Sequence, residues 1–130
     1  MTAKILVVED EAVVAMEIQS TLERLGYFVI GIENTGEGAI NKTKEAKPDL
    51  VLMDIRIKGE MDGIEAASRI RSVSEIPLIF LTAYAEEDKL ERAKLTLPYG
   101  YILKPFQDRD LKVMVEMALY AAKIELERKQ

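Results

Sequence analysis

The sequence of 130 residues contains no cysteine, no histidine and no tryptophan. Without cysteine, disulfides, iron–sulfur clusters and thiolate zinc sites are excluded. Without histidine, serine–histidine–aspartate triads, histidine metal sites and a histidine general base are excluded. No stretch approaches the ~18 consecutive apolar residues of a membrane-spanning helix. Any chemistry must therefore use carboxylates, hydroxyls, lysine, arginine or the backbone.

Composition and charge narrow the class of protein further. Hydrophobic residues make up 48% of the chain, which is enough to build the core of one domain. The 23 acidic residues outnumber the 18 basic ones, and the net charge of −5 argues against a broad contact with nucleic acid or anionic lipid. The first residues run directly into a short apolar segment and do not resemble a signal peptide. We therefore expect a cytoplasmic domain with no nucleic acid and no membrane among its direct partners.

The apolar residues predict alternating strands and helices. Five short runs are nearly continuous rather than alternating, which is typical of strands buried on both faces of a parallel sheet. They lie at residues 5–8, 27–32, 50–53, 78–81 and 101–103. Helical spacing predicts helices near residues 14–25, 35–46, 63–73 and 87–95 and from Asp108 onward, with Thr35 and Asp108 as N-caps and Gly26 as a stop. This alternation predicts an α/β fold with a doubly wound parallel sheet.

Charged and hydroxyl residues follow four of the five predicted strands. Glu9 and Asp10 follow the first strand, Asp54 the third, Thr82 the fourth and Lys104 the fifth. In open α/β sheets the functional crevice lies at the carboxyl ends of the strands. These side chains are therefore predicted to share one edge of the sheet.

The acids at this edge predict a divalent-cation site. Glu9, Asp10 and Asp54 converge if the first and third strands are neighbours, and carboxylates that close repel one another unless something neutralises them. A hard cation with oxygen ligands does so, and Mg²⁺ is favoured over Ca²⁺ because no oxygen-rich loop of the EF-hand kind is present. The alternative is that Glu9, Asp10 and Glu11 only cap the first helix, where acids suit the positive end of the helix dipole.

The remaining groups at the edge suit phosphoryl transfer. Asp54 follows an apolar strand and could act as a nucleophile that forms an acyl phosphate. Lys104 and Thr82 could neutralise or bind the phosphoryl oxygens. Taken singly, Asp54 also fits a turn or helix cap, Lys104 a surface lysine, and Thr82 a strand former or cap. The chain contains neither the P-loop nor the glycine-rich dinucleotide motif, so a bound nucleotide is not expected.

These residues resemble the receiver domain of two-component response regulators over nearly the whole chain. The segments that carry the resemblance are residues 5–11 (ILVVEDE), 50–55 (LVLMDI), 61–63 (MDG), 77–83 (PLIFLTA) and 100–106 (GYILKPF). The resemblance implies a flavodoxin-like sheet in the order 2-1-3-4-5 with five helices; the same order is known for a chemotaxis receiver. We expect residues 1–122 to form this domain and residues 123–130 to extend its last helix.

The resemblance also implies a role for each site residue. Asp54 would be the phosphoacceptor, Asp10 a direct Mg²⁺ ligand and Glu9 a second acid acting through water. The backbone carbonyl of Arg56 would be a further metal ligand, and Lys104, with a cis bond to Pro105, would bind the phosphoryl group. Thr82 would be the switch hydroxyl and Tyr101 its aromatic partner. Phosphorylation would shift the surface formed by the fourth helix, fifth strand and fifth helix.

Two features depart from the family's usual pattern. Glu9 stands where an aspartate is commoner, which could alter metal affinity. Lys58 stands where a proline is frequent, and the loop that follows the phosphoacceptor is one residue longer. The resemblance implies a phosphohistidine as the donor, and these 130 residues contain no histidine. The donor is therefore expected to be a histidine kinase, a phosphotransfer protein or, if the chain is part of a longer protein, another domain.

Rival functions remain at this point. A haloacid-dehalogenase-like phosphatase also uses an aspartate nucleophile with Mg²⁺, but it needs an acid two residues further on, where this chain has Arg56, and a cap domain. A degenerate receiver would bind partners without phosphorylation, and the intact Asp10, Asp54, Thr82 and Lys104 argue against it. A flavodoxin-like cofactor module lacks a phosphate loop and a stacking tryptophan. The favoured interpretation is a signalling switch rather than a turnover enzyme.

The last predicted helix has two apolar stripes. The stripe assigned to the core consists of Leu111, Val115, Ala118, Ala122 and Leu126. The second stripe consists of Val113, Met117, Tyr120 and Ile124. A helix that is apolar on two sides needs a second partner. That partner is either the fourth helix of the same chain or a second copy in a homodimer, through the fourth helix, fifth strand and fifth helix or through the extended last helix.

Overall fold

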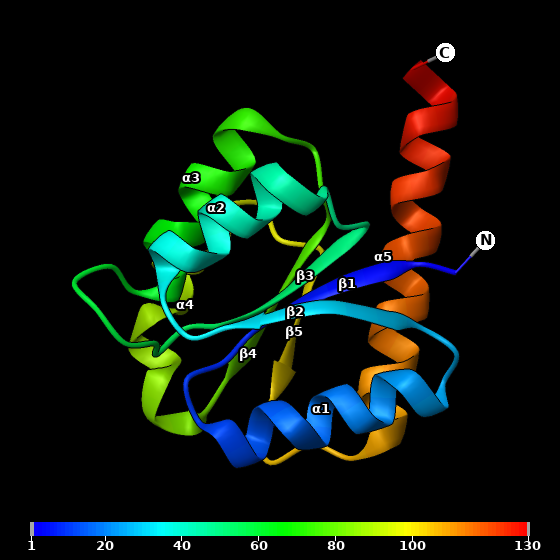
Figure 1. Cartoon of the computed structure of the whole chain (residues 1–130). Helices are drawn as coiled ribbons and strands as arrows, with labels where there is room; N and C mark the ends of the chain where they lie inside the picture. The colour runs from blue at the N-terminus through cyan, green and yellow to red at the C-terminus, as the bar shows by residue number, and fades with distance from the viewer. Residues whose placement is uncertain (1, 130) are drawn as a thin grey trace.

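The computed structural model describes residues 2–129, apart from the side chains of residues 84, 85 and 87. It contains one parallel sheet of five strands in the order β2-β1-β3-β4-β5 (Figure 1). The strands are β1 (Lys4–Val8), β2 (Phe28–Glu33), β3 (Leu50–Asp54), β4 (Leu78–Thr82) and β5 (Gly100–Leu103). The helices are α1 (Ala12–Arg24), α2 (Gly36–Ala46), α3 (Gly63–Val73), the 3₁₀ helix η1 (Tyr84–Lys89), α4 (Leu90–Lys94) and α5 (Asp108–Lys129). The predicted flavodoxin-like fold and strand order are confirmed.

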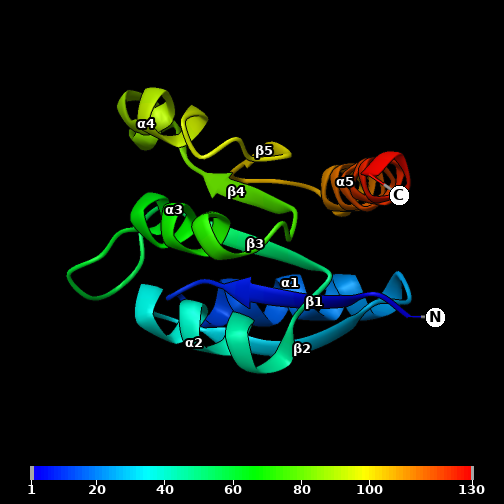
Figure 2. The same ribbon diagram turned by 90° about the horizontal axis from the view of Figure 1, so that it is seen from above.

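Helices cover both faces of the sheet, and the strand side chains alternate between two cores (Figure 2). One core contains Leu6, Val8, Val51, Met53 and Phe80 together with residues of α2, α3 and α4. The other contains Ile5, Val7, Leu50, Leu52 and Ile79 together with residues of α1 and α5. Because both faces are buried, each strand must be apolar at nearly every position, as the sequence shows.

Two predicted helix boundaries have the expected chemistry and a third does not. The Thr35 side chain accepts a hydrogen bond from the Gly38 N–H and caps α2. Gly26 follows α1 with a φ of 96°, a conformation that glycine adopts without steric cost. Asp108 is predicted to be an N-cap, but it is the first residue of α5 and not the residue before it. Its carboxylate instead accepts hydrogen bonds from Thr21 and Arg24 of α1, a long-range contact that local spacing could not predict.

Asp62 caps α3 and supplies the first testable prediction. Its side chain accepts a hydrogen bond from the Glu65 N–H at 2.9 Å and pairs with Arg92 of α4 at 3.1 Å. Burial alone would raise the pKa of Asp62, but these two interactions outweigh burial and lower it below its ordinary 3.8. We expect Asp62→Ala to reduce the free energy of unfolding at neutral pH by about 1 kcal/mol. Urea unfolding of both proteins measures the difference.

The pH dependence of this difference follows from the lowered pKa of Asp62. A group with a depressed folded pKa contributes stability above its unfolded pKa and loses that contribution as the pH falls through the folded value. The gap between wild type and Asp62→Ala should therefore shrink in acid, while Asp62→Asn, which keeps a capping oxygen, should lose less at neutral pH. A gap that is the same at neutral and strongly acidic pH would contradict this explanation.

The fourth helix is shorter than predicted. A single helix over residues 87–95 was expected, whereas the chain forms η1 followed by α4, which ends at Lys94. Ala93 is the one buried residue of α4, and Leu95 and Leu97 are 83% and 72% exposed. Because helices in proteins are stabilised mainly by packing of an apolar face, a segment with so little to bury forms only a short helix.

The last helix differs from its predicted packing toward its C-terminal end. Leu111, Val115 and Ala118 are buried as expected, but Leu126 is 56% exposed, so its assignment to the core was wrong. Figure 1 shows α5 continuing beyond the edge of the sheet, where no strand lies beneath it. Val113, Met117 and Tyr120 are each at least half exposed, so α4 does not cover the second stripe. Within residues 2–129, no helix is both long and apolar enough to cross a membrane.

Candidate functional site

The site lies at the carboxyl edge of the sheet because the strands are parallel and adjacent. β1 pairs with β3, β3 with β4 and β4 with β5. Each of these strands is followed or ended by a residue of the predicted site: Glu9 and Asp10 after β1, Asp54 at the end of β3, Thr82 at the end of β4 and Lys104 after β5. The topology therefore brings together residues that are up to 95 positions apart in the chain.

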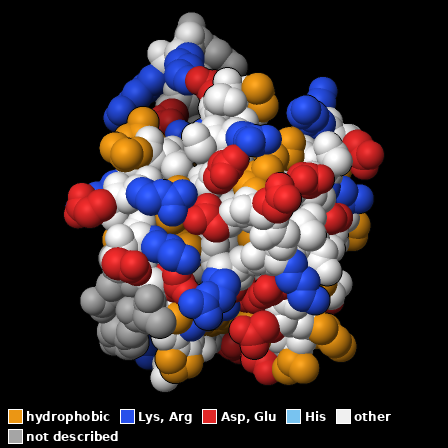
Figure 3. Space-filling view, turned by 90° about the vertical axis from the view of Figure 1, so that its left-hand side faces the viewer, with side chains coloured by type: hydrophobic (Ala, Val, Ile, Leu, Met, Phe, Trp, Pro, Cys, Tyr) orange, Lys and Arg blue, Asp and Glu red, His pale blue; other side chains and the backbone are white. Residues whose placement is uncertain are grey.

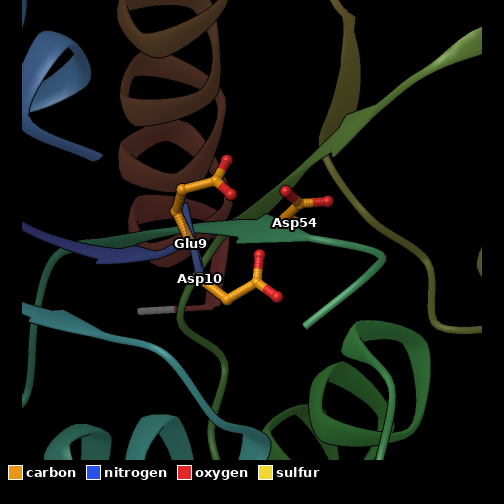
Figure 4. Close-up of side chains that lie close together, drawn as sticks. All are labelled: Glu9, Asp10 and Asp54. Carbon is orange, nitrogen blue, oxygen red and sulfur yellow. The ribbon is translucent and has the colours of Figure 1, made fainter. Parts of the chain in front are cut away.

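Three carboxylates form the centre of the site. Glu9, Asp10 and Asp54 each offer one oxygen, and these oxygens lie within 4.8 Å of one another. Figure 4 shows the three side chains directed toward a common space from the ends of β1 and β3. Glu9 and Asp54 are buried, and Asp10 is half-buried. Oxygen atoms in this arrangement match the ligands that a hard divalent cation prefers.

Lys104 bridges two of the three acids. Its Nζ lies 2.5 Å from Asp54 Oδ2 and 2.8 Å from Glu9 Oε1. The backbone holds it there, since the Lys104 N–H donates to the Thr82 carbonyl at 2.7 Å. The bond between Lys104 and Pro105 is cis, as the resemblance implied. Burial would lower the pKa of Lys104, but its hydrogen bonds to the two carboxylates outweigh burial and raise it. The ammonium is therefore charged at neutral pH.

The raised pKa of Glu9 indicates that the positive charge in the site does not balance the negative charge of the acids. The pKa of Glu9 is raised from 4.5 to about 7, mainly by burial and also by the adjacent Asp54, although the hydrogen bonds from Lys104 and the Glu11 N–H lower it. One lysine thus does not fully compensate the buried acids. A divalent cation among these oxygens would favour their ionised forms, so the residues present fit a Mg²⁺ ion.

The local backbone fixes Asp54 from the other side. Its Oδ1 accepts a hydrogen bond from the Arg56 N–H at 3.0 Å, so Asp54 stabilises the turn after β3 as well as contacting Lys104. Gly63 returns to this turn, where its N–H donates to the Ile55 carbonyl at 2.8 Å. A Cβ at Gly63 would overlap the Asp54 carbonyl oxygen, so only glycine fits. Asp54 therefore combines two roles that the sequence left as alternatives: it stabilises a turn, and it lies in the charged site.

The helix-cap alternative for the first acids has little support. Glu11 occupies the N-cap position of α1, but among the described residues its side chain makes no capping hydrogen bond. Glu9 Oε2 accepts a hydrogen bond from the Glu11 N–H at 3.2 Å, while its other oxygen contacts Lys104. Glu9 is thus directed mainly toward the site.

Thr82 and Tyr101 lie beside the acids without bonding to them. The Thr82 hydroxyl is placed to donate to the Ala83 carbonyl, at 3.3 Å. The Tyr101 ring stacks on Phe80 with centroids 6.0 Å apart, and its buried hydroxyl has no hydrogen-bond partner in the described part of the chain. Thr82 and Tyr101 both line a pocket of about 290 Å³. Its lining consists of Thr82, Ala83, Leu90, Lys94, Tyr101 and Leu103.

Sequence reasoning missed one charged residue near the site. Glu86 of η1 is 4% exposed, and its carboxylate pairs with Arg56 Nε at 3.0 Å and with Lys89 Nζ at 2.8 Å. The spacing of Glu86 and Lys89 was visible as a local pair, but nothing in the sequence links Glu86 to Arg56, which lies 30 positions earlier. The Arg56 side chain thus points to η1 while its N–H contacts Asp54.

A parallel sheet in this order, with three acids and a lysine at its carboxyl edge, defines a doubly wound α/β domain with a candidate cation site. Residues 5–116 match the family model described as the response regulator receiver domain, and the chain belongs to this family. Receiver domains are signalling switches of two-component phosphorelays rather than turnover enzymes. They bind Mg²⁺ through acidic residues and interact with histidine kinases or phosphotransfer proteins.

Comparisons with individual proteins agree with this assignment. The chain is 37% identical over 116 residues to the transcriptional regulatory protein PdtaR of Mycobacterium tuberculosis, covering 89% of this chain and 56% of PdtaR. It is 37% identical over 126 residues to the alkaline phosphatase synthesis regulator PhoP of Bacillus subtilis, covering 95% and 51%. The chain thus spans about half the length of these curated relatives.

A solved structure shows the same fold over nearly the whole chain. It is the signal receiver domain of a modulated diguanylate cyclase from Desulfovibrio desulfuricans G20. The two are 35% identical and superpose with a TM-score of 0.90, covering 96% of this chain and 99% of that one. The aligned share of this chain is larger than residues 5–116, the part that the family model matches.

Proposed function

We propose that Asp54 accepts a phosphoryl group from a phosphohistidine on a partner protein and that this chain later catalyses its hydrolysis. An oxygen of Asp54 attacks the phosphorus, and the bond from phosphorus to the donor nitrogen breaks with its electron pair left on the imidazole. The observation that carries the proposal is the contact of Lys104 with both Asp54 and Glu9 at the carboxyl edge. An ammonium in that place is positioned to neutralise charge that develops on a transferred phosphoryl group.

The metal site is the second part of the proposal. Asp10 and Asp54 would hold Mg²⁺ directly, the Arg56 carbonyl would be a further ligand, and Glu9 would act through water. The bound ion would offset charge on a phosphoryl oxygen and on the acids. The proximity of the three carboxylates and the raised pKa of Glu9 support this assignment. Arg56 occupies the position where the rival phosphatase needs an acid, and its side chain is paired with Glu86.

The switch is the third part of the proposal. A phosphoryl group on Asp54 would be a stronger acceptor than the Ala83 carbonyl, so the Thr82 hydroxyl would turn toward it. The pocket between Thr82 and Tyr101 leaves space for both side chains to move. The surface formed by α4, β5 and α5 would change as a result, which biases an equilibrium between two arrangements.

The central experiment asks whether Asp54 is modified. Wild type and Asp54→Ala are incubated with Mg²⁺ and a small phosphodonor, and intact mass is measured; beryllofluoride binding is followed by fluorine NMR. Asp49→Ala is the matched control, because Asp49 directly precedes the same strand at its opposite end. We expect modification of wild type and Asp49→Ala and none of Asp54→Ala. Equal labelling of all three, or of none, would refute the proposal.

We also propose a cytoplasmic homodimer that uses the second stripe of α5. Val113, Met117 and Tyr120 recur at intervals of four and three residues and are exposed. This spacing matches the seam of two packed helices. Sedimentation with and without beryllofluoride measures the dimer, and Met117→Glu should abolish it. A wild type that stays monomeric in both conditions would exclude this interface.

The proposed domain limits follow the packing of α5. Ala118 is the last buried residue of α5, and residues 1–122 are proposed to be the phosphoacceptor unit with 123–130 as a helical extension. Glu125, which accepts a hydrogen bond from the Tyr99 hydroxyl at 2.6 Å, and Lys129, which pairs with Glu75, attach this extension to the domain.

A further inference from the structure

We propose that Glu86 is a positioning residue that acts through Arg56 and holds η1 in the resting arrangement, so that their ion pair opposes the phosphorylated one. This inference rests on the proposed function, because it concerns the cost of the switch at Asp54. The Arg56–Glu86 pair joins two segments that are separate in sequence, the turn after β3 and the 3₁₀ helix after β4.

The contacts around this pair form a continuous chain from Asp54 to the Thr82 hydroxyl. The Arg56 N–H donates to Asp54 Oδ1 at 3.0 Å, and its Nε lies 3.0 Å from Glu86 Oε1. The Glu86 N–H donates to the Ala83 carbonyl at 2.9 Å. The same carbonyl is the acceptor placed for the Thr82 hydroxyl. If the Thr82 hydroxyl turns toward Asp54, it leaves the Ala83 carbonyl, which is the same group that accepts the hydrogen bond from the Glu86 N–H.

Burial makes the pair energetically relevant. The Glu86 side chain is 6% exposed and the Arg56 side chain is 74% exposed. A buried carboxylate needs its cationic partners, so displacement of η1 must break the contact with Arg56 or carry Arg56 along. Since the Arg56 N–H also holds Asp54, carrying Arg56 along would disturb the turn after β3. The pair thus adds to the free energy that a phosphoryl group must supply to move η1.

A second ion pair joins the same two regions. Arg92 of α4 pairs with Asp62, which lies at the end of the loop between β3 and α3. Figure 3 shows acidic and basic side chains interleaved over the face that carries this loop. Lys89, in contrast, pairs with Glu86 from within η1, and among the described residues it forms no ion pair with another segment. Arg56 and Lys89 therefore both pair with the Glu86 carboxylate. Arg56 connects η1 to the turn after β3, whereas Lys89 belongs to η1 itself.

The test uses this difference between the two cations. The variants are Glu86→Gln and Arg56→Gln, their double mutant, and Lys89→Gln as the matched control. Beryllofluoride affinity in the presence of Mg²⁺ is measured by fluorine NMR, and amide exchange of η1 and α4 is measured without either ligand. We expect Glu86→Gln and Arg56→Gln each to bind beryllofluoride about fivefold more tightly than wild type. This factor corresponds to the upper end of the free energies measured for ion pairs with an exposed side chain. The double mutant should show no further gain, because both changes remove one interaction.

The readouts separate a positioning role from a merely structural one. A residue that only stabilises the fold would, when changed, lower stability and leave beryllofluoride affinity unchanged or weaker. The proposed role predicts faster amide exchange in η1 together with tighter binding, while Lys89→Gln stays within about twofold of wild-type affinity. Unchanged or weaker binding by Glu86→Gln and Arg56→Gln, or effects that add in the double mutant, would overturn the inference.

Failure of the proposed function gives a different pattern. Wild type would then take up no beryllofluoride, whichever residue stands at position 86. The exchange measurement still decides the inference in that case, since it needs no ligand. If amide exchange in η1 is as slow in Glu86→Gln and Arg56→Gln as in wild type, the pair does not stabilise the position of η1.

Discussion

Replacing Gly63 by alanine is expected to reduce the free energy of unfolding by about 3 kcal/mol, because the added methyl group has no space. A Cβ at this position would overlap the carbonyl oxygen of Asp54 and crowd the Ile55 backbone. Backbone atoms of a buried strand end cannot rotate away as a flexible side chain does. The strain therefore falls on the residue proposed to accept the phosphoryl group, so Mg²⁺ affinity should fall along with stability. Urea unfolding and magnesium titration measure the two effects.

Gly59→Ala is the matched control for Gly63→Ala. Gly59 lies in the same loop with a φ of 99°, but nothing lies within 4 Å of the position that its Cβ would take. Its replacement should cost only the conformational strain of an L-residue at positive φ, about 1 kcal/mol. Equal losses in the two variants, or a Gly63→Ala protein as stable as wild type, would show that the turn tolerates a side chain.

Replacing Lys104 by methionine is expected to change stability and metal affinity in opposite directions. The variant leaves Glu9 and Asp54 buried without their cation, and removal of one partner from such a group costs about 3 kcal/mol. The same change frees the two carboxylate oxygens that Lys104 contacts at 2.8 and 2.5 Å. Mg²⁺ should therefore bind about tenfold more tightly, since a competing positive charge is gone. Unfolding with and without Mg²⁺ and calorimetric titration check both results.

Lys94→Met serves as the control for Lys104→Met. Lys94 pairs with Glu91, and both side chains are more than half exposed, so its loss should leave the stability nearly unchanged. Because the pKa of Lys104 is raised, its contribution is fully present at neutral pH and is lost only as the pH rises through the folded value. Weaker Mg²⁺ binding by Lys104→Met would mean that the lysine supports the metal site instead of competing with it.

Much of the fold was predictable because the relevant signals are local. Apolar runs located each strand to within about one residue of its observed limits, and α3 has the predicted ends. The convergence of Asp10, Asp54 and Lys104 was predictable too, since parallel strands place their carboxyl ends at one edge. Family resemblance was still needed to give the strand order, because periodicity states which segments are strands but not which are neighbours.

The errors occurred where packing between distant segments outweighs local pattern. Leu126 continues the apolar spacing of α5, yet it is exposed because the sheet ends before the helix does. Asp108 has the residue type of an N-cap, but Thr21 and Arg24 of α1 bind its carboxylate. The segment after Thr82 has helical spacing but little apolar surface, so it forms η1 and only a short α4.

The order of the residues and their local interactions thus account for the strands, most helix limits and the chemical character of the carboxyl edge. Contacts across the fold account for the rest: the distances among Glu9, Asp54 and Lys104, the raised pKa of Glu9, and the pairing of Arg56 with Glu86. Burial and charge separation depend on which surfaces meet, and a sequence read residue by residue does not contain that information. The sequence alone identifies the acids, but only their burial in the folded chain shows how strongly they need a cation.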